Sequence, residues 1–181
     1  CIEAFSSPFY HPMAEGTAVE GLRLVKENIQ EVYHNGINIK ARAHMLVASM
    51  MGAAAFQKGL GAIHSITHPV NSLYHTHHGT TNGTVMPFVL NFNRSVIEKK
   101  FDRLAKFLNI SNGFEGVVNW IIELKKEMEI PETLKEMGVK KGDEVKLAPL
   151  AQEDPSTGGN PLEMSEDKFQ ELILNCIEGN Y

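Results

Sequence analysis

The chain has 181 residues, of which 43% are hydrophobic and 22% charged, a composition that excludes extensive intrinsic disorder. Lys and Arg number 17 and Asp and Glu 22, giving a formal net charge of −5, and no basic block suggests binding to nucleic acid. The longest nearly uncharged stretch, residues 60–93, is too rich in His, Gly, Thr and Asn for a membrane span.

The two ends of the chain carry information about its origin. Cys1 and Cys176 are the only cysteines, they form no C-x-x-C pair, and no secretory leader opens the sequence. We therefore expect either a reducing compartment, with a cytoplasmic location, or simply no structural role for sulfur. Ile2 and Phe5 share a helical face with no capping residue before them, which indicates a piece cut from a longer protein within a helix. A processed terminus is the alternative.

Helical periodicity begins after a short loop. Residues 6–16, with two prolines and two aromatic residues, predict a loop. Thr17, followed three residues later by Glu20, predicts a capping box for a helix that runs to Tyr33. A second helix is expected over residues 39–56, and because its centre is almost entirely small or apolar, we expect it to be central and buried.

The middle of the chain combines helical patterns with helix breakers. A third helix is expected through residues 62–73, with Pro69 either kinking it or occupying its first turn. Residues 77–79 predict a loop, and a further helix is expected around residues 84–91. Gly59 and Gly61 lie just before this region and favour close helix packing over ligand contact.

The second half predicts amphipathic helices over residues 94–109 and 114–128, and a shorter one over residues 144–152. Ser165 predicts the cap of a final helix. No segment alternates apolar and polar residues as a strand does. The expected fold is a single all-α, multi-helix bundle-like domain over residues 1–181, with about eight helices.

Histidines form the main functional signal. Five of the eight histidines fall within fifteen positions: His64, His68, His75, His77 and His78. His64 and His68 are four residues apart, so on a helix they share one face and could bind one metal ion. Ser65 stands where a zinc protease needs a glutamate. Residues 60–93 contain no Asp or Glu, so a carboxylate ligand would come from elsewhere. Metal or acid–base function and an ordinary surface role both stay open on these residues alone.

Two short segments carry a more specific pattern. They are Gly61-Ala62-Ile63-His64-Ser65-Ile66-Thr67-His68-Pro69 and His78-Gly79-Thr80-Thr81-Asn82, the latter followed by Met86-Pro87. They resemble the signature of the iron-containing (group III) alcohol dehydrogenases, which is G-x-x-H-x-x-x-H-P, a spacer, H-G-x-x-N and an apolar helix with Pro. The opening residues 1–5 resemble the stretch just after the D-x-x-x-H element of that family. The resemblance covers the whole chain as the C-terminal helical domain of the family.

The resemblance implies a dehydroquinate synthase-like C-terminal domain that lacks its N-terminal nucleotide-binding domain. It implies one divalent iron, with zinc as an alternative, held by one Asp and three His. His64 and His78 match two of these ligands, and the Asp and the remaining His are expected immediately before Cys1. His68 matches the histidine near nicotinamide and substrate, with catalytic and cofactor-binding roles. Phe56 matches a substrate-pocket position, although its spacer to Gly59 is one residue shorter than in many members.

The implied function is NAD- or NADP-linked interconversion of an alcohol and an aldehyde or ketone by hydride transfer. The expected partners are a small alcohol or aldehyde, the nucleotide-binding domain and a second copy of the protein, with no nucleic acid and no membrane. The chain alone contains no G-x-G-x-x-G phosphate cradle, so we expect it to be inactive by itself. The alternative is a non-catalytic helical interaction module with a vestigial histidine cluster.

Overall fold

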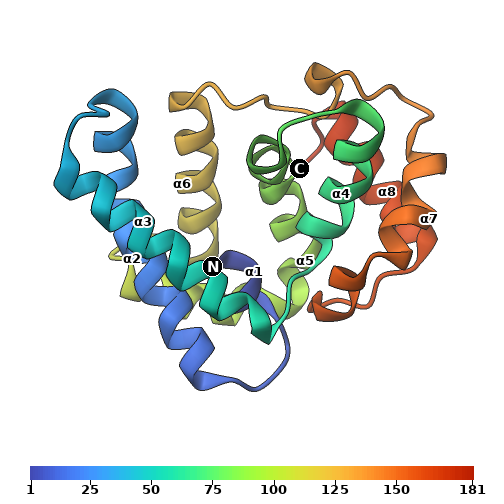
Figure 1. Ribbon diagram of the computed structural model, residues 1–181. Helices are drawn as coiled ribbons and strands as arrows, with labels where there is room; N and C mark the ends of the chain where they lie inside the picture. Colours follow the sequence, from blue (N-terminus) through green and yellow to red (C-terminus); the bar gives the residue numbers. More distant parts are fainter.

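The computed structural model describes residues 1–181 and contains only helices, which confirms the all-α prediction. Eight are α-helices and three are short 3₁₀ helices (Figure 1). In chain order they are α1 Ile2–Ser6, α2 Pro12–His34, α3 Ile39–Ala55, η1 Phe56–Lys58, α4 Ala62–Tyr74, α5 His78–Phe107, α6 Gly113–Glu127, η2 Lys135–Met137, α7 Glu144–Glu153, η3 Pro155–Gly159 and α8 Glu166–Glu178.

The helices surround one hydrophobic core. In Figure 1, α2 and α3 form a hairpin on one side, α4, α7 and α8 gather on the other, and α5 runs between them. One cluster of 34 buried apolar residues draws on both sides of the molecule. Phe101 of α5 lies near its centre, with ring centroids 5.9 Å from Phe5 of α1 and 5.7 Å from Phe114 of α6. These aromatic contacts attach the short N-terminal helix to the main body.

The start of α2 differs from the sequence prediction. The helix begins at Pro12, because the imidazole Nδ1 of His11 accepts a hydrogen bond from the backbone N–H of Ala14 at 3.2 Å. Proline is favoured at the first helical position, since its missing N–H has no helical partner there. Thr17 therefore lies inside the helix and donates its hydroxyl to the carbonyl of Met13. The predicted loop over residues 6–16 is correct only for residues 7–11, and the predicted capping box at Thr17 is wrong.

Prolines do not interrupt α4 or α5. Pro69 lies within α4 and Pro87 within α5, and each removes one backbone hydrogen bond while the helix continues. The two helices predicted over residues 84–91 and 94–109 are thus one helix of 30 residues. The predicted loop over residues 77–79 is also wrong, because His77 caps α5 and accepts a hydrogen bond from the N–H of Thr80.

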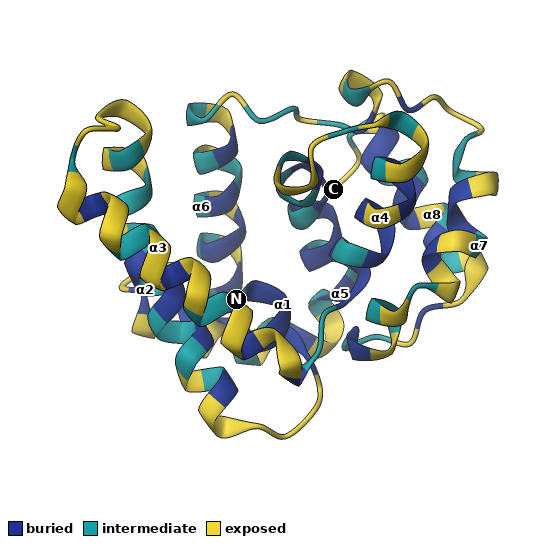
Figure 2. Cartoon of the chain, in the orientation of Figure 1, coloured by how far each residue is buried: buried dark blue, intermediate teal, exposed yellow.

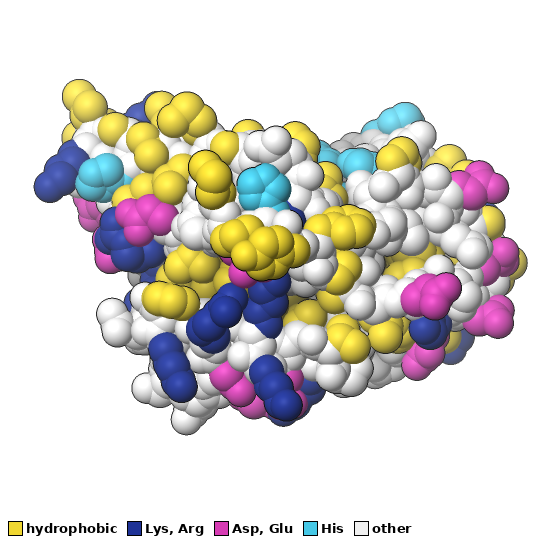
Figure 3. All heavy atoms as spheres, turned by 90° about the horizontal axis from the view of Figure 1, so that it is seen from below, with side chains coloured by type: hydrophobic (Ala, Val, Ile, Leu, Met, Phe, Trp, Pro, Cys, Tyr) yellow, Lys and Arg dark blue, Asp and Glu magenta, His cyan; other side chains and the backbone are white.

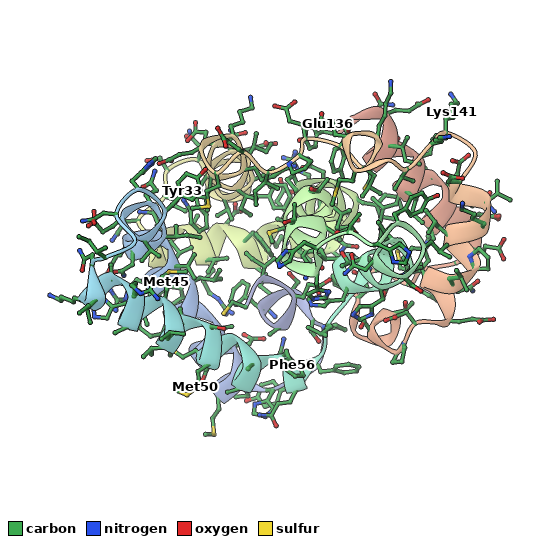
Figure 4. The ribbon with its side chains drawn as sticks, turned by 45° about the horizontal axis from the view of Figure 1, so that its top comes forward. Tyr33, Met45, Met50, Phe56, Glu136 and Lys141 are labelled. Atoms are coloured by element: carbon green, nitrogen blue, oxygen red, sulfur yellow. The ribbon has the colours of Figure 1, made fainter.

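Helix α3 is not buried on all sides, contrary to the prediction from its composition. Its small residues Ala41, Ala48 and Ala55 are buried at seven-residue intervals, and α3 packs closely on α2. Its large residues point the other way: Leu46 is 73% exposed and Met50 65% exposed. Figure 2 shows the alternation of buried and exposed residues along this helix, and Figure 4 shows Met50 on its outer side. An apolar composition alone does not reveal whether a helix is covered on both sides.

None of the helices is, by itself, long and apolar enough to cross a membrane. The segments 39–58 and 62–74 meet the criteria of length and composition only when taken together, and they are bent by 107° relative to one another.

A buried lysine joins α1 to the end of α3. The side chain of Lys58 is fully buried, and its ammonium donates to the carbonyls of Ala4 at 2.9 Å and Ser7 at 2.6 Å. The carboxylate of Glu15 lies 3.2 Å away and also pairs with Lys100 at 2.7 Å. An ammonium group beside the C-terminal end of a helix, here α1, can donate hydrogen bonds to carbonyls that have no partner within that helix. Lys58 therefore fixes α1 against the rest of the fold.

Replacing this lysine should destabilise the protein. The Lys58→Met substitution leaves the carbonyls of Ala4 and Ser7 without a donor, so we expect the free energy of unfolding to fall by about 2–4 kcal/mol near neutral pH. Urea denaturation followed by circular dichroism measures this loss. Lys99→Met is the matched control, because Lys99 is exposed on α5. Equal stability of the two variants would contradict the assigned role of Lys58.

The same lysine should make stability depend on pH. Burial and, to a lesser extent, the charge of Lys100 lower the pKa of Lys58 to about 8, while Glu15 acts to raise it. The unfolded chain holds this proton up to the ordinary pKa of 10.5, so the unfolded state binds more protons between these values. The free energy of unfolding, measured as wild type minus Lys58→Met, should therefore rise between about pH 8 and about pH 10.5, by at most about 3 kcal/mol. A difference that stays constant across this range would contradict the prediction.

Candidate metal centre

A short connection between α4 and α5 brings three histidines together. His64 and His68 lie one turn apart on α4, and His78 is the first residue of α5. Only residues 75–77 separate the two helices. His75 has a left-handed backbone conformation with φ of 55°, which ends α4 and turns the chain. The second helix therefore starts beside the middle of the first.

The three imidazole rings form a compact group. The ring centroids of His64 and His78 are 5.3 Å apart, those of His64 and His68 5.7 Å, and those of His68 and His78 5.6 Å. The side-chain amide nitrogen of Asn82 lies 3.4 Å from Nε2 of His64 and 3.0 Å from Nε2 of His78. The Nε2 atoms of these two histidines thus face one common position.

Glu3 orients the first histidine. Its Oε1 accepts a hydrogen bond from the backbone N–H of Ile63 at 2.7 Å, and its Oε2 pairs with Nδ1 of His64. A carboxylate at Nδ1 holds the ring proton there and leaves Nε2 with a free lone pair, the arrangement common around metal-bound histidines. Sequence reasoning missed Glu3, because it lies on α1, far from the histidines in the chain.

Asp154 holds the second histidine in the same way. Its Oδ2 lies 2.7 Å from Nδ1 of His68, and its Oδ1 accepts the N–H of Ser156 at 2.8 Å. The pKa of Asp154 is lowered: burial, the largest influence, acts to raise it, but the hydrogen bonds from His68 and Ser156 outweigh burial. The carboxylate is therefore ionised beside the imidazole. Nothing in the sequence pattern indicated this pairing, because 86 residues separate Asp154 from His68.

Asp154 begins a segment that runs along α4. The hydroxyl oxygens of Thr157 and Ser65 lie 2.8 Å apart, within hydrogen-bonding distance, and the side-chain oxygen of Asn160 accepts the N–H of Ala62 at 3.2 Å. We name residues 154–160 the strap. Its contacts at every third residue match residues 68, 65 and 62 of α4 in antiparallel order. The strap thus holds successive turns of the helix that carries His64 and His68.

Glycines allow the strap to approach. A Cβ atom at Gly159 would lie 2.1 Å from the carbonyl oxygen of Leu60, and one at Gly61 would lie 3.0 Å from the side-chain oxygen of Asn160. Gly59 has a φ of 138°, a conformation that favours glycine. The glycines before His64 therefore serve close packing, as the sequence predicted.

The chemistry of the cluster fits part of a metal site. Burial lowers the pKa of His78, and the neighbouring imidazoles of His64 and His68 lower it further, which favours the neutral form that binds metals. The side-chain oxygen of Asn82 is buried without a hydrogen-bond partner. The chain contains no group of three or more His, Cys, Asp or Glu side chains that could hold a metal ion. A cation at this cluster would be held by two imidazole nitrogens, and its other ligands would come from outside this set.

The remaining predicted residues lie around the cluster. Phe56 is the first residue of η1, at the end of α3 (Figure 4); the residue is 48% exposed, and its ring stacks on none of the three imidazoles. His75 and His77 lie in the connection, where His75 ends one helix and His77 caps the next. The structure therefore brings His64, His68 and His78 together and leaves the other two histidines in local backbone roles.

Comparison with known proteins gives a consistent match. Residues 1–177 match the model of the "Fe-containing alcohol dehydrogenase family, C-terminal". The chain is 34% identical to a 4-hydroxybutyrate dehydrogenase of Cupriavidus necator, over 96% of this chain and 47% of that protein. It is 32% identical to an NAD-dependent methanol dehydrogenase of Bacillus methanolicus, over 97% and 48%. The chain thus spans about half the length of the curated relatives it matches.

Solved structures match at the level of the whole domain. The crystal structure of a 1,3-propanediol oxidoreductase superimposes with a TM-score of 0.92 at 27% sequence identity, over 97% of this chain and 48% of the other. The helical fold of this chain is therefore shared with about half of a known oxidoreductase.

The strap should contribute strongly to stability. Asn160 is buried and exchanges hydrogen bonds with Asn93 at 2.9 and 3.0 Å, in addition to its contact with Ala62. Asn160→Ala leaves these groups unpaired, so we expect a loss of about 2–4 kcal/mol in the free energy of unfolding. Denaturant titration measures the loss, with Asn119→Ala on the exposed side of α6 as the control. A loss no larger than in the control would show that the strap is not anchored through Asn160.

Proposed function

The chain belongs to the Fe-containing alcohol dehydrogenase family as its C-terminal domain, and on that premise we propose that it supplies the metal-binding side of an NAD(P)-linked alcohol dehydrogenase site. The observation that carries the proposal is the convergence of His64 and His78, whose Nε2 atoms face the same amide nitrogen of Asn82. The proposed reaction interconverts an alcohol and an aldehyde or ketone by hydride transfer.

We assign His64 and His78 as metal ligands, with divalent iron as the cation and zinc as the alternative. A divalent cation bound by them supplies Lewis acidity toward an alcohol oxygen. Glu3 keeps the ring proton of His64 on Nδ1, so that Nε2 remains a donor of its lone pair. Glu3 also places α1 beside the cluster, which supports an Asp and a His immediately before Cys1 as the other ligands.

We assign His68 to the cofactor and substrate side of the site, with a role in holding or moving a proton. Its ring is 44% exposed and stacks on His78 with an interplanar angle of 17°, so it is accessible from solvent while remaining ordered. The hydride chemistry itself belongs to the nicotinamide. The half-exposed ring of Phe56 supports a place at the edge of the substrate pocket.

The surface of the chain supports a partner domain. The outer residues of α3 form an exposed apolar face that includes Ile39, Leu46 and Met50. Figure 3 shows further hydrophobic side chains on the underside of the molecule, mixed with Lys and Arg. Exposed apolar surface of this kind is typical of interaction sites. We propose that an N-terminal nucleotide-binding domain covers part of it, that the complete protein acts in the cytoplasm, and that it forms a homodimer.

Metal titration tests the proposal on the chain itself. Two neutral imidazoles without a carboxylate ligand should bind a divalent ion weakly, so calorimetric titration with Zn²⁺, or with Fe²⁺ under anaerobic conditions, should show weak binding. His64→Ala and His78→Ala should abolish it, and Glu3→Gln should weaken it by about 10–100-fold, because the amide no longer fixes the Nδ1 proton. The same preparation should oxidise no alcohol with NAD or NADP.

The control for the titration is His75→Asn, since asparagine tolerates the left-handed backbone at this position and His75 lies outside the cluster. It should bind metal as the wild type does. Equal binding by wild type, His64→Ala and His78→Ala would refute the ligand assignment. Stoichiometric binding that survives dialysis against a chelator and is lost in His64→Ala would show a site that is complete within this chain, and the divided site proposed here would be wrong.

A further inference from the structure

The ring of His68 is exposed and packs against other imidazoles, so a contact from another part of the chain must fix its orientation. Its ring lies 5.7 Å from the ring of His64 and 5.6 Å from that of His78, measured between centroids. The hydrogen bond to Asp154 at Nδ1 is the one that its ring makes in the structure. An imidazole that makes no other hydrogen bond can exchange its proton between the two nitrogens or rotate, unless this one contact holds it.

The carboxylate that makes this contact is itself fixed. Asp154 is the N-cap residue of η3, with Oδ1 committed to the N–H of Ser156, so that Oδ2 is left for His68. The side chain of Asp154 is only 11% exposed. Backbone geometry, rather than a flexible surface pairing, therefore determines where the carboxylate lies.

The rest of the strap fixes the register between Asp154 and α4. Thr157 donates its hydroxyl proton to the carbonyl of Ala151 at 2.7 Å, which ties the strap back to α7, while the contact of its hydroxyl oxygen with Ser65 ties the strap to α4. Asn160 holds the first turn of α4 through Ala62. A segment attached at two further points places its first residue opposite His68 without freedom to slide.

We propose that Asp154 is the positioning residue of His68, holding the ring proton on Nδ1 so that Nε2 is free to accept a proton. The use of that proton in catalysis rests on the proposed function. The effect of Asp154 on the ring of His68 does not depend on it. When Nε2 takes the hydroxyl proton of an alcohol, the O–H bond breaks, an N–H bond forms, and the charge of the imidazolium is balanced by the carboxylate of Asp154. Asp154 itself stays ionised, as carboxylates behind a catalytic histidine do.

The tautomer of His68 can be measured directly in the 181-residue chain. Long-range ¹H–¹⁵N correlation spectra at about pH 8, above the ordinary imidazole pKa, distinguish Nδ1–H from Nε2–H in a neutral ring. The signals of His68 are identified by their absence in His68→Gln. We expect wild type to carry the proton on Nδ1, whereas an unconstrained neutral histidine prefers Nε2–H.

The informative variant is Asp154→Ser. Serine remains a good N-cap for the N–H of Ser156 but is too short to reach His68, so η3 should be retained while the carboxylate is lost. We expect His68 to shift to Nε2–H in this variant. Glu153→Gln, at the neighbouring exposed position, should keep Nδ1–H.

Either of two results would overturn the proposal: Nε2–H at His68 in the wild type, or the same tautomer in wild type and Asp154→Ser. The wild-type spectrum decides the first without any variant, so the test holds even if Asp154→Ser fails to fold. Because the readout needs neither metal nor cofactor, its failure would leave the ligand assignment of His64 and His78 untouched. Failure of the metal titration would likewise leave the tautomer result standing.

Discussion

Two carboxylates hold the histidine face of α4 from opposite ends of the chain. Glu3 reaches Nδ1 of His64 from α1, and Asp154 reaches Nδ1 of His68 from the strap. Each carboxylate is in turn held by a backbone N–H, that of Ile63 for Glu3 and that of Ser156 for Asp154. Imidazoles on one face of a helix would otherwise sample several rotamers and both tautomers. The site therefore depends on tertiary structure: Lys58 holds α1, and the strap must reach α4, before the ring nitrogens point in defined directions.

The hydrophobic core of this domain and its exposed apolar face are formed by different residues. Aromatic contacts around Phe101 and the strap give the chain its own core, so the histidine face is organised by residues of this chain alone. The apolar face of α3 is not needed for that core, because the small residues of α3 already complete its packing against α2. The chain, which spans about half the length of its relatives, thus has a fully packed core and an exposed apolar face. This combination is typical of domains that lie next to another domain.

Much of the fold could be predicted from the sequence because helical periodicity is a local property. The helices predicted over residues 114–128 and 144–152 and the cap at Ser165 are close to the predicted positions. The spacing of His64 and His68 predicted that these two rings share one face, and the motif added His78 to the same group. Glu3 and Asp154 could not be found in this way, since their partners lie 61 and 86 residues away in the chain. The burial of α3 and the continuity of α5 through Pro87 were also mispredicted, because both depend on what lies beside the helix, and packing can outweigh a local penalty of about 3 kcal/mol.

The three-residue connection between α4 and α5 has a consequence for how this protein can vary in length. Every residue of that connection is in use: His75 reverses the chain, Thr76 bonds to Asn71, and His77 caps the next helix. An inserted residue would rotate the start of α5 and carry His78 away from His64, even if the loop itself closed at little entropic cost. The turn at residues 35–38 and the segment around Gly142 do not position any of the clustered histidines. Insertions and deletions should therefore accumulate at those two places, while the distance from His64 to His78 along the chain stays constant.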